Sequence, residues 1–304
     1  DKVPLKYQGL NGTEIAISES QERMAVVVRL EDADVFIAEC AKENIAAVVV
    51  ATVTDKPSLV MTWNGQTIVD LERSFLDTNG VRVVVDAKVI DKAVNLPEKR
   101  TTSIATLETD TLAVLSDLNH ASQKGLQTIF DSSVGRSTIN HPIGGRYQIT
   151  PTEASVQKLP VQHGVTTTAS AIAQGYNPYI AEWSPYHGAA YAVIEATARL
   201  VATGANWSQA RFSYQEYFER MDKQAERFGQ PVSALLGSIE AQFQLGLPSI
   251  GGKDSMSGTF EELTVPPTLV AFGVTTADSR RVLSPEFKAA GQYTVSYTHL
   301  TLPT

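Results

Sequence analysis

The sequence lacks three features that would each point to a particular class of protein. Cys40 is the only cysteine among 304 residues, which excludes a disulfide framework and a cysteine metal cluster. The formal net charge of −8 argues against binding to nucleic acid or a membrane surface, since both need a basic face. No apolar run reaches the roughly 18 residues of a membrane-spanning helix. We therefore expect a cytoplasmic protein with small-molecule ligands, and neither nucleic acid nor a membrane as partner.

The composition itself is that of a folded chain. Hydrophobic residues make up 43% and charged residues 19% of the sequence, which suffices for an apolar core. The length exceeds the roughly 100–200 residues of one domain, so two domains are expected. Cys40 falls in a helical pattern and is expected to be a small buried side chain. The chain begins without methionine, and we expect it to be a piece of a longer protein.

Strand and helix patterns alternate along the first seventy residues. Residues 24–30 and 45–54 are rich in valine and predict strands. Residues 31–44, between them, carry apolar side chains at helical spacing. Asn64 and Gly65 separate two alternating runs, which is a strong hairpin signal. The order predicts a β-α-β-β unit, hence a sheet with helices and not a helical bundle.

A second α/β unit is expected after a polar segment that contains a helix. Helical patterns cover residues 108–122, 187–205 and 221–245, and residues 265–276 predict a strand. Gly125 is expected to end a helix. The spacing of Ala234, Leu235, Ile239 and Phe243 predicts the buried face of the helix at 221–245.

The run 249-SIGGKDSMSGTF-260 has the composition of a phosphate-binding loop. Consecutive glycines let backbone N–H groups approach a phosphate, and Lys253 adds a positive charge. A P-loop is excluded, because Gly252 stands where its lysine belongs and Asp254 follows Lys253. The loop of ATP pyrophosphatases is closer and stays an alternative, although that loop opens a helix and this one runs toward two prolines. A solvated loop without a ligand is equally compatible with the residue types.

Four stretches in fixed order resemble one known family. They are 14-EIAISESQERMAVVV-28, 144-GGRYQITP-151, 184-SPYHGAAYAVIEA-196 and 247-LPSIGGKDSMSGTFE-261. Together they resemble the large, glutamine-dependent phosphoribosylformylglycinamidine synthases of purine biosynthesis, over about residues 3–291.

The resemblance implies an α/β (α+β) fold of aminoimidazole-ribonucleotide-synthetase-like domains, with mixed sheets covered by helices. It implies the C-terminal part of a first B domain at 1–78, a helical linker at 79–126 and a second A domain at 127–291. Residues 292–304 would be the truncated start of a second B domain or an artefactual tail. The A domain is expected to form an intrachain pseudo-dimer with a first A domain that lies outside this sequence.

The activity implied is that of an ATP-dependent carbon–nitrogen ligase. Family members convert formylglycinamide ribonucleotide to formylglycinamidine ribonucleotide, with ATP and Mg²⁺ and with ammonia that a glutaminase domain releases from glutamine. The catalytic residues are expected outside this chain, so the isolated fragment is expected to be inactive. A non-catalytic, structural half of the synthetase is the alternative from another class.

The resemblance also assigns binding residues. Glu19, Ser20 and Gln21 match a substrate-binding run, while a capping box of Ser18 and Gln21 is the local alternative.

In the glycine loop, Gly251, Gly252, Lys253 and Asp254 are candidates for nucleotide binding, and Ser255 for substrate binding. Lys253 stands where smaller relatives carry a metal-binding asparagine. Because a protonated lysine cannot ligate Mg²⁺, we expect Lys253 to contact phosphate directly.

Glu195 matches a Mg²⁺ ligand of a structural nucleotide site in larger relatives. The two further ligand positions are occupied by Arg199 and His163, so an ion pair of Glu195 with Arg199, four residues apart, is the alternative. His187 and His163 are expected to be capping or packing residues and not acid–base groups.

Overall fold

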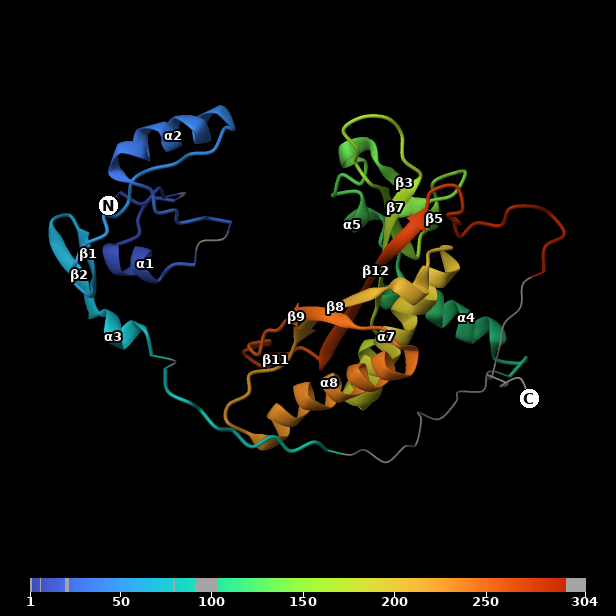
Figure 1. The fold of residues 1–304 in the computed structure, drawn as a ribbon. Helices are drawn as coiled ribbons and strands as arrows, with labels where there is room; N and C mark the ends of the chain where they lie inside the picture. Colours follow the sequence, from blue (N-terminus) through green and yellow to red (C-terminus); the bar gives the residue numbers. More distant parts are fainter. Residues whose placement is uncertain (1, 6, 20–21, 79, 91–102, 294–304) are drawn as a thin grey trace. The chain divides into compact units, whose positions relative to one another are not determined.

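The computed structural model describes the chain except residues 1, 6, 20–21, 79, 91–102 and 294–304. The chain forms two compact units, Asp1–Val84 and Val85–Thr304, which are described separately (Figure 1). Within the described residues, no helix is both long and apolar enough to cross a membrane.

The first unit contains a two-stranded sheet and short helices. Its elements are α1 (Gly12–Ile17), the 3-10 turn η1 (Leu30–Asp32), α2 (Ala33–Lys42), β1 (Ser58–Trp63), β2 (Gln66–Glu72) and α3 (Arg73–Leu76). Strands β1 and β2 pair antiparallel around Asn64 and Gly65, both of which have positive φ angles. The helix at 33–42 and this hairpin confirm the sequence prediction.

Two of the predicted strands in this unit are wrong. Residues 24–29 and 45–54 form no strand, and Val27 and Val53 are 82% and 78% exposed. A strand needs a hydrogen-bonded neighbour, and the described part of this unit offers these segments none. Cys40 lies in α2 as predicted, but it is only half-buried.

Helix α1 has a capping box, but not the one that the sequence offered as a local alternative to substrate binding. Asn11 and Glu14 bond each other's backbone N–H groups, which makes them the reciprocal pair that begins α1. The alternative pair was Ser18 and Gln21. Ser18 instead ends α1, and Gln21 lies outside the described residues.

The second unit is built on one mixed sheet. Its elements are α4 (Leu107–Ser116), η2 (Leu118–His120), α5 (Lys124–Gln127), η3 (Val134–Arg136), β3 (Thr138–Asn140), β4 (Ile143–Gly144), β5 (Thr150–Pro151), β6 (Ala154–Lys158), β7 (Thr168–Gly175), α6 (Pro178–Trp183), α7 (Pro185–Ala202), η4 (Trp207–Gln209), β8 (Arg211–Tyr217), α8 (Ala225–Leu245), β9 (Ser249–Lys253), β10 (Thr259–Phe260), β11 (Leu263–Thr264) and β12 (Thr268–Asp278). The predicted helices near 187–205 and 221–245 and the strand near 265–276 are confirmed as α7, α8 and β12. Gly125 lies inside α5 and does not end a helix, so that prediction is wrong.

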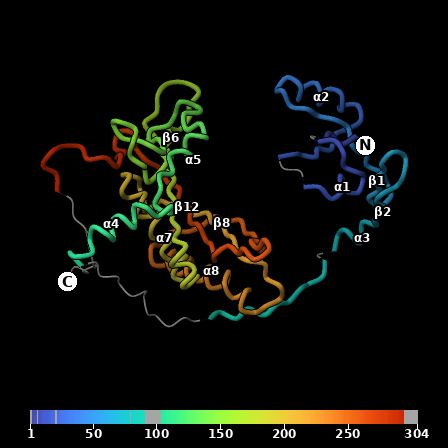
Figure 2. The backbone as a smooth tube through the Cα atoms, turned by 180° about the vertical axis from the view of Figure 1, so that it is seen from behind, coloured from blue at the N-terminus to red at the C-terminus, as the bar shows by residue number. Residues whose placement is uncertain are grey.

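The six strands of the main sheet have the order β3-β6-β7-β12-β8-β9. Neighbours pair antiparallel except β8 and β9, which are parallel and are joined through α8. Helix α7 packs on β7 and β12, and α8 packs alongside α7 (Figure 2). The sheet thus has one face covered by helices, and a second face on which Ile172 and Val274 are each 40% exposed.

Small residues set the distances in this helix layer. A Cβ atom on Gly175 of β7 would lie 2.0 Å from the carbonyl oxygen of Ala192 in α7. A Cβ atom on Gly237 of α8 would lie 1.9 Å from the carbonyl oxygen of Tyr186. Both contacts are closer than any side chain allows, so glycine is required at each position.

The buried face of α8 differs from the predicted one. Its buried residues are Gly229, Pro231, Ser233, Ala234, Gly237, Ser238 and Ala241. Of the predicted stripe, Ala234 is buried, whereas Leu235, Ile239 and Phe243 are 40%, 43% and 80% exposed. The helices approach each other too closely for leucine or phenylalanine, and the large side chains point outward.

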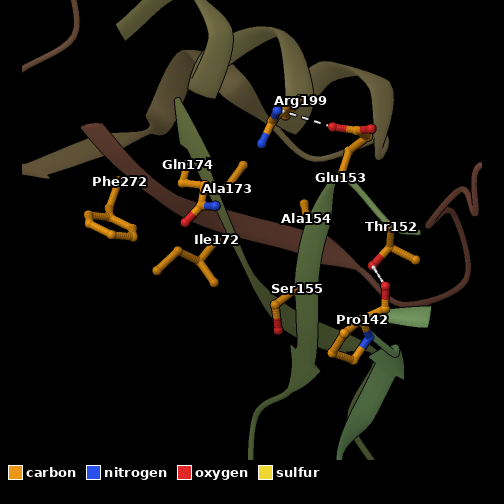
Figure 3. A pocket seen from close by; sticks show the side chains of 10 residues that line it. All are labelled: Pro142, Thr152, Glu153, Ala154, Ser155, Ile172, Ala173, Gln174, Arg199 and Phe272. Carbon is orange, nitrogen blue, oxygen red and sulfur yellow. Dashed lines mark hydrogen bonds and ion pairs between the residues drawn. The ribbon is translucent and has the colours of Figure 1, made fainter. Parts of the chain in front are cut away.

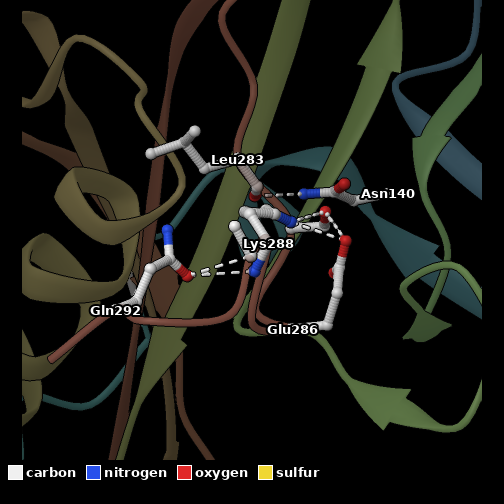
Figure 4. A network of polar contacts seen from close by, with 7 residues as sticks. Asn140, Leu283, Glu286, Lys288 and Gln292 are labelled. Atoms are coloured by element: carbon white, nitrogen blue, oxygen red, sulfur yellow. Dashed lines mark hydrogen bonds and ion pairs between the residues drawn. The ribbon is translucent and has the colours of Figure 1, made fainter. Parts of the chain in front are cut away.

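The segment after β12 folds back onto the sheet edge (Figure 4). Asn140 of β3 donates a hydrogen bond to the carbonyl oxygen of Leu283 at 3.3 Å. Lys288 binds Glu286 at 2.6 Å, and the side-chain oxygen of Gln292 accepts a bond from the backbone N–H of Lys288 at 3.1 Å. The first contact ties Leu283 to β3, and the other two hold residues 286–292 together within the segment.

One charged side chain is buried in the sheet. Phe212, Tyr214 and Glu216 alternate along β8 on its buried side, and Glu216 is only 7% exposed. Burial, and then the negative charge of Asp254, raise the pKa of Glu216 from 4.5 to about 6.

The contact at Gly237 yields a stability prediction. Replacing Gly237 by alanine should lower the free energy of unfolding by about 1–3 kcal/mol, because the new Cβ atom meets backbone that must move. Urea unfolding of the chain measures the loss. Gly125→Ala is the matched control, since nothing lies within 4 Å of the place that its new Cβ atom would take. Equal stability of the two variants would contradict the packing argument.

The raised pKa of Glu216 predicts how stability depends on pH. A carboxyl with a higher pKa in the folded chain than in the unfolded chain binds more protons when folded. The contribution of Glu216 to the free energy of unfolding is therefore present below pH 4.5 and is lost as the pH rises through about 6. Between pH 4.5 and 7, the parent should lose on the order of 1 kcal/mol more unfolding free energy than Glu216→Gln.

Urea midpoints at the two pH values measure that difference. Glu262→Gln, which changes an exposed glutamate of the same unit, is the matched control and should lose as much as the parent. A Glu216→Gln profile parallel to that of the parent would show that burial of this carboxyl has no thermodynamic consequence.

Candidate functional site

The carboxyl ends of β8 and β9 carry the predicted nucleotide-binding run. Gly251, Gly252 and Lys253 are the last residues of β9, and Asp254 and Ser255 follow it directly. This is the parallel pair of the main sheet, and its connection is the helix α8. In open sheets, ligands bind in the crevice beyond the carboxyl ends of parallel strands.

Gly251 and Gly252 are each glycine for a different structural reason. Gly251 has a φ angle of +141°, which favours glycine, and it lies where the register of β9 on β8 shifts by one residue. A Cβ atom on Gly252 would lie 2.7 Å from the carbonyl oxygen of Tyr214. Both residues are exposed on the outer side of this edge strand, so a ligand can reach their backbone.

The loop after β9 is held by the backbone of β8. The N–H of Ser255 donates to the carbonyl oxygen of Glu216 at 3.0 Å, and its own carbonyl accepts from the N–H of Phe218 at 2.9 Å. The side chain of Gln215 donates to the carbonyl of Lys253 at 3.1 Å. The loop is therefore positioned by the strand and not by its own side chains.

Polar side chains gather on this positioned loop. The hydroxyls of Ser255 and Ser257 lie 3.2 Å apart, and Lys253 and Asp254 are exposed. The ammonium and the two hydroxyls suit a phosphate group, and a carboxylate suits the hydroxyls of a sugar.

Glu216 belongs to this group and the sequence prediction missed it. It ends the buried row of β8, and the charge of Asp254 contributes to its raised pKa. A signal was available, because the alternation of Phe212, Tyr214 and Glu216 places a carboxyl on an apolar face. A charge at such a position is unusual and marks a functional candidate.

The context of the loop bears on the pyrophosphatase alternative. That loop requires a helix directly after it, whereas here the hairpin of β10 and β11 comes next. Gly258 and Thr259 attach this hairpin to the loop after β8, through bonds to Phe218 and Arg220. The residues after β9 therefore do not form the strand–loop–helix arrangement that this alternative needs.

The predicted substrate residues lie in the first unit. Glu19 follows α1 and is exposed. Ser20 and Gln21 lie outside the described residues. Their role in binding substrate stays a prediction.

Glu195 and His187 lie on helix α7 and not on the loop that follows β9. Glu195 pairs with Arg199 at 2.8 Å, as the alternative interpretation expected. His187 lies in the first turn of α7, where its Nδ1 is 2.9 Å from the hydroxyl of Ser184, the residue that caps this helix. The Trp183 ring lies 4.9 Å from the imidazole. His163 is exposed in a loop.

Part of the chain matches a described domain family. Residues 1–64 match the family described as "AIR synthase related protein, C-terminal domain".

Curated relatives match much more of the chain. The phosphoribosylformylglycinamidine synthase subunit PurL of Streptomyces avermitilis is 31% identical over 278 residues, which are 89% of this chain and 35% of the relative. The PurL subunit of Thermococcus sibiricus is 27% identical over 96% of this chain and 38% of its own length. The chain thus spans somewhat more than a third of these relatives.

Solved structures show the same fold. PurLQS of Thermotoga maritima matches with a TM-score of 0.65 at 20% identity, over 94% of this chain and 43% of the other. Thermotoga maritima PurL in complex with FGAR matches with a TM-score of 0.61 at 21% identity, over 94% of this chain and 42% of the other. The predicted fold class is thereby confirmed.

The sequence relatives and the structural neighbours agree, and over the third of those proteins that it spans, the chain belongs to the phosphoribosylformylglycinamidine synthase family.

Proposed function

We propose that this chain is part of a phosphoribosylformylglycinamidine synthase of purine biosynthesis in the cytoplasm. In this reaction the amide oxygen of formylglycinamide ribonucleotide attacks the γ-phosphorus of ATP, and ADP leaves. Ammonia then adds to the activated carbon and phosphate leaves, giving the amidine. The relatives named PurL support the proposal, as do the Thermotoga maritima PurL structures in complex with ATP and with FGAR.

The observation that carries the proposal is the loop at the carboxyl ends of β8 and β9. Lys253 would neutralise phosphate charge, the exposed backbone of Gly251 and Gly252 would donate hydrogen bonds, and Ser255 would contact the ribonucleotide. Asp254 would accept from ribose hydroxyls. From the family resemblance alone, Glu19, Ser20 and Gln21 of the first unit are further candidates for binding the ribonucleotide.

ATP would bring Mg²⁺ with its phosphates. Within the described residues, no group of three or more histidine, cysteine, aspartate or glutamate side chains is arranged to hold a metal ion. The residues of the glycine loop therefore fit contact with phosphate and not a metal cage of their own. The catalytic groups, and a glutaminase that releases ammonia from glutamine, would belong to other parts of the enzyme.

A structural role as half of a pseudo-dimer is the second candidate. Ile172 of β7 and Val274 of β12 face each other across the strands on the uncovered face of the sheet, and Phe272 is half-buried beside them. An apolar sheet face of this kind favours a partner sheet. The partner would be the first A domain, with residues 127–291 as the second.

Lys253 and Ser255 give the test of binding. Lys253→Met should weaken binding of formylglycinamide ribonucleotide or ATP roughly tenfold, because a charge-assisted phosphate contact is lost. Ser255→Ala should weaken binding of the ribonucleotide about fivefold, through one lost hydrogen bond. Isothermal titration calorimetry on the 304-residue chain measures both.

The matched control is Lys124→Met, which removes an exposed lysine elsewhere in the same unit. It should leave both affinities unchanged. Binding that is indifferent to Lys253→Met and Ser255→Ala would favour the purely structural role.

The uncovered sheet face gives the test of the pseudo-dimer. Ile172→Lys combined with Val274→Glu places opposite charges on a directly paired position, so the strands can still pair. In the full-length enzyme, this double variant should lower the melting temperature by roughly 2–4 °C, the range for about 1 kcal/mol lost from a domain of roughly 150–250 residues. The 304-residue chain alone should melt as before.

Leu235→Lys is the control, because Leu235 on α8 is also 40% exposed. An unchanged melting temperature of the full-length double variant would argue against a partner on this face.

A further inference from the structure

Arg199 links three parts of the second unit. Its Nε lies 3.1 Å from a carboxylate oxygen of Glu153, immediately before β6, and its Nη2 lies 2.8 Å from Oε1 of Glu195. The other oxygen of Glu195 accepts a hydrogen bond from the backbone N–H of Tyr176, just after β7, at 2.8 Å. The guanidinium therefore stands between two carboxylates on different elements.

These residues do not fit the metal that the family resemblance implies at Glu195. Mg²⁺ requires oxygen ligands at about 2.1 Å in octahedral geometry. Both oxygens of Glu195 already accept hydrogen bonds, from Arg199 and from the backbone N–H of Tyr176. A guanidinium nitrogen of Arg199 also lies beside the carboxylate of Glu153. Neither His163, which lies in an exposed loop, nor another described side chain completes a group of three ligands.

The ion pair of Arg199 with Glu153 borders an open pocket of about 240 Å³ (Figure 3). Arg199 and Glu153 form one side of it, with Gln174 and Ser155 nearby and the Phe272 ring opposite. The side chain of Arg199 is 31% exposed and that of Glu195 36%. Solvent thus reaches the ion pairs, and an added cation could reach the two carboxylates if the guanidinium were absent.

We propose that the Arg199 guanidinium occupies the place of a divalent cation between Glu153 and Glu195, so that this position in the chain binds no metal. A guanidinium suits this role because it stays protonated and its planar fork offers N–H groups in two directions at once. A lysine ammonium is a point charge and matches this geometry less well. The inference does not depend on the proposed enzymatic activity.

The consequence is that removing the guanidinium creates a metal site. In Arg199→Ala, two carboxylates face each other without a counter-charge, which is a site for an oxygen-binding cation completed by water. Mn²⁺ alone is the probe, and electron paramagnetic resonance of free Mn²⁺ measures its binding. Arg199→Ala should bind Mn²⁺ roughly tenfold or more tightly than the parent, because Coulomb repulsion by the guanidinium is removed.

Three further variants decide the assignment. Arg199→Ala combined with Glu195→Gln should lose the gained site, and Arg199→Lys should not gain one. Arg211→Ala is the matched control, since the guanidinium of Arg211 donates to the backbone carbonyls of Gln209 and Ala210 and forms no ion pair with a described residue. In the parent chain, Glu195→Gln should leave Mn²⁺ binding unchanged, and this comparison holds even if Arg199→Ala fails to fold.

Two results would overturn the proposal. One is a Mn²⁺ site in the parent that disappears in Glu195→Gln, since the position would then hold a metal beside Arg199. The other is a folded Arg199→Ala variant with no gain in Mn²⁺ binding, since the guanidinium would then not be what keeps the cation out.

Discussion

The close approach of β9 to β8 at Gly252 is the contact on which the candidate site depends. Because Gly252 has no side chain to clash with the carbonyl of Tyr214, β9 stays paired with β8 from Gly251 to Lys253. That register brings Ser255 to the backbone of Glu216 and Phe218. The polar residues after β9 are thus set by a backbone contact three residues earlier, and a larger residue at 252 would displace all of them together.

The charges at this edge follow from the same geometry. Lys253 is exposed at the end of β9, whereas Glu216 is buried at the end of β8 and has a raised pKa. Near neutral pH the buried carboxyl of Glu216 is within about one pH unit of its raised pKa of about 6. An anionic ligand at this edge, as proposed, would therefore lie near one positive group, Lys253, and two carboxyl groups, Asp254 and Glu216.

Local signals in the sequence predicted local structure well. Asn64 and Gly65 predicted the hairpin because both residues adopt the positive φ angles that the turn needs. The β-branched run at 45–54 failed, since strand formation depends on a neighbour that the segment itself does not encode. On α8, hydrophobicity favoured Leu235 and Phe243 as the buried side, but the required closeness of Tyr186 favoured Gly237. The loop at 251–255 could be located from residue types, whereas Glu216 needed attention to which face of β8 it occupies.

Two of the positions at which the family resemblance implies metal ligands in relatives carry cationic side chains here, Lys253 and Arg199. A cation that is part of the chain needs no binding equilibrium, so its effect does not depend on the concentration of free Mg²⁺. A cationic side chain also cannot dissociate, so the positive charge at its position is permanent. At Arg199 this fixed charge is neutralised by Glu153 and Glu195 and ties α7 to the strands. The ammonium of Lys253 is exposed at the end of β9, which fits the ligand-binding role proposed for it, whereas the ion pairs of Arg199 fit a structural role.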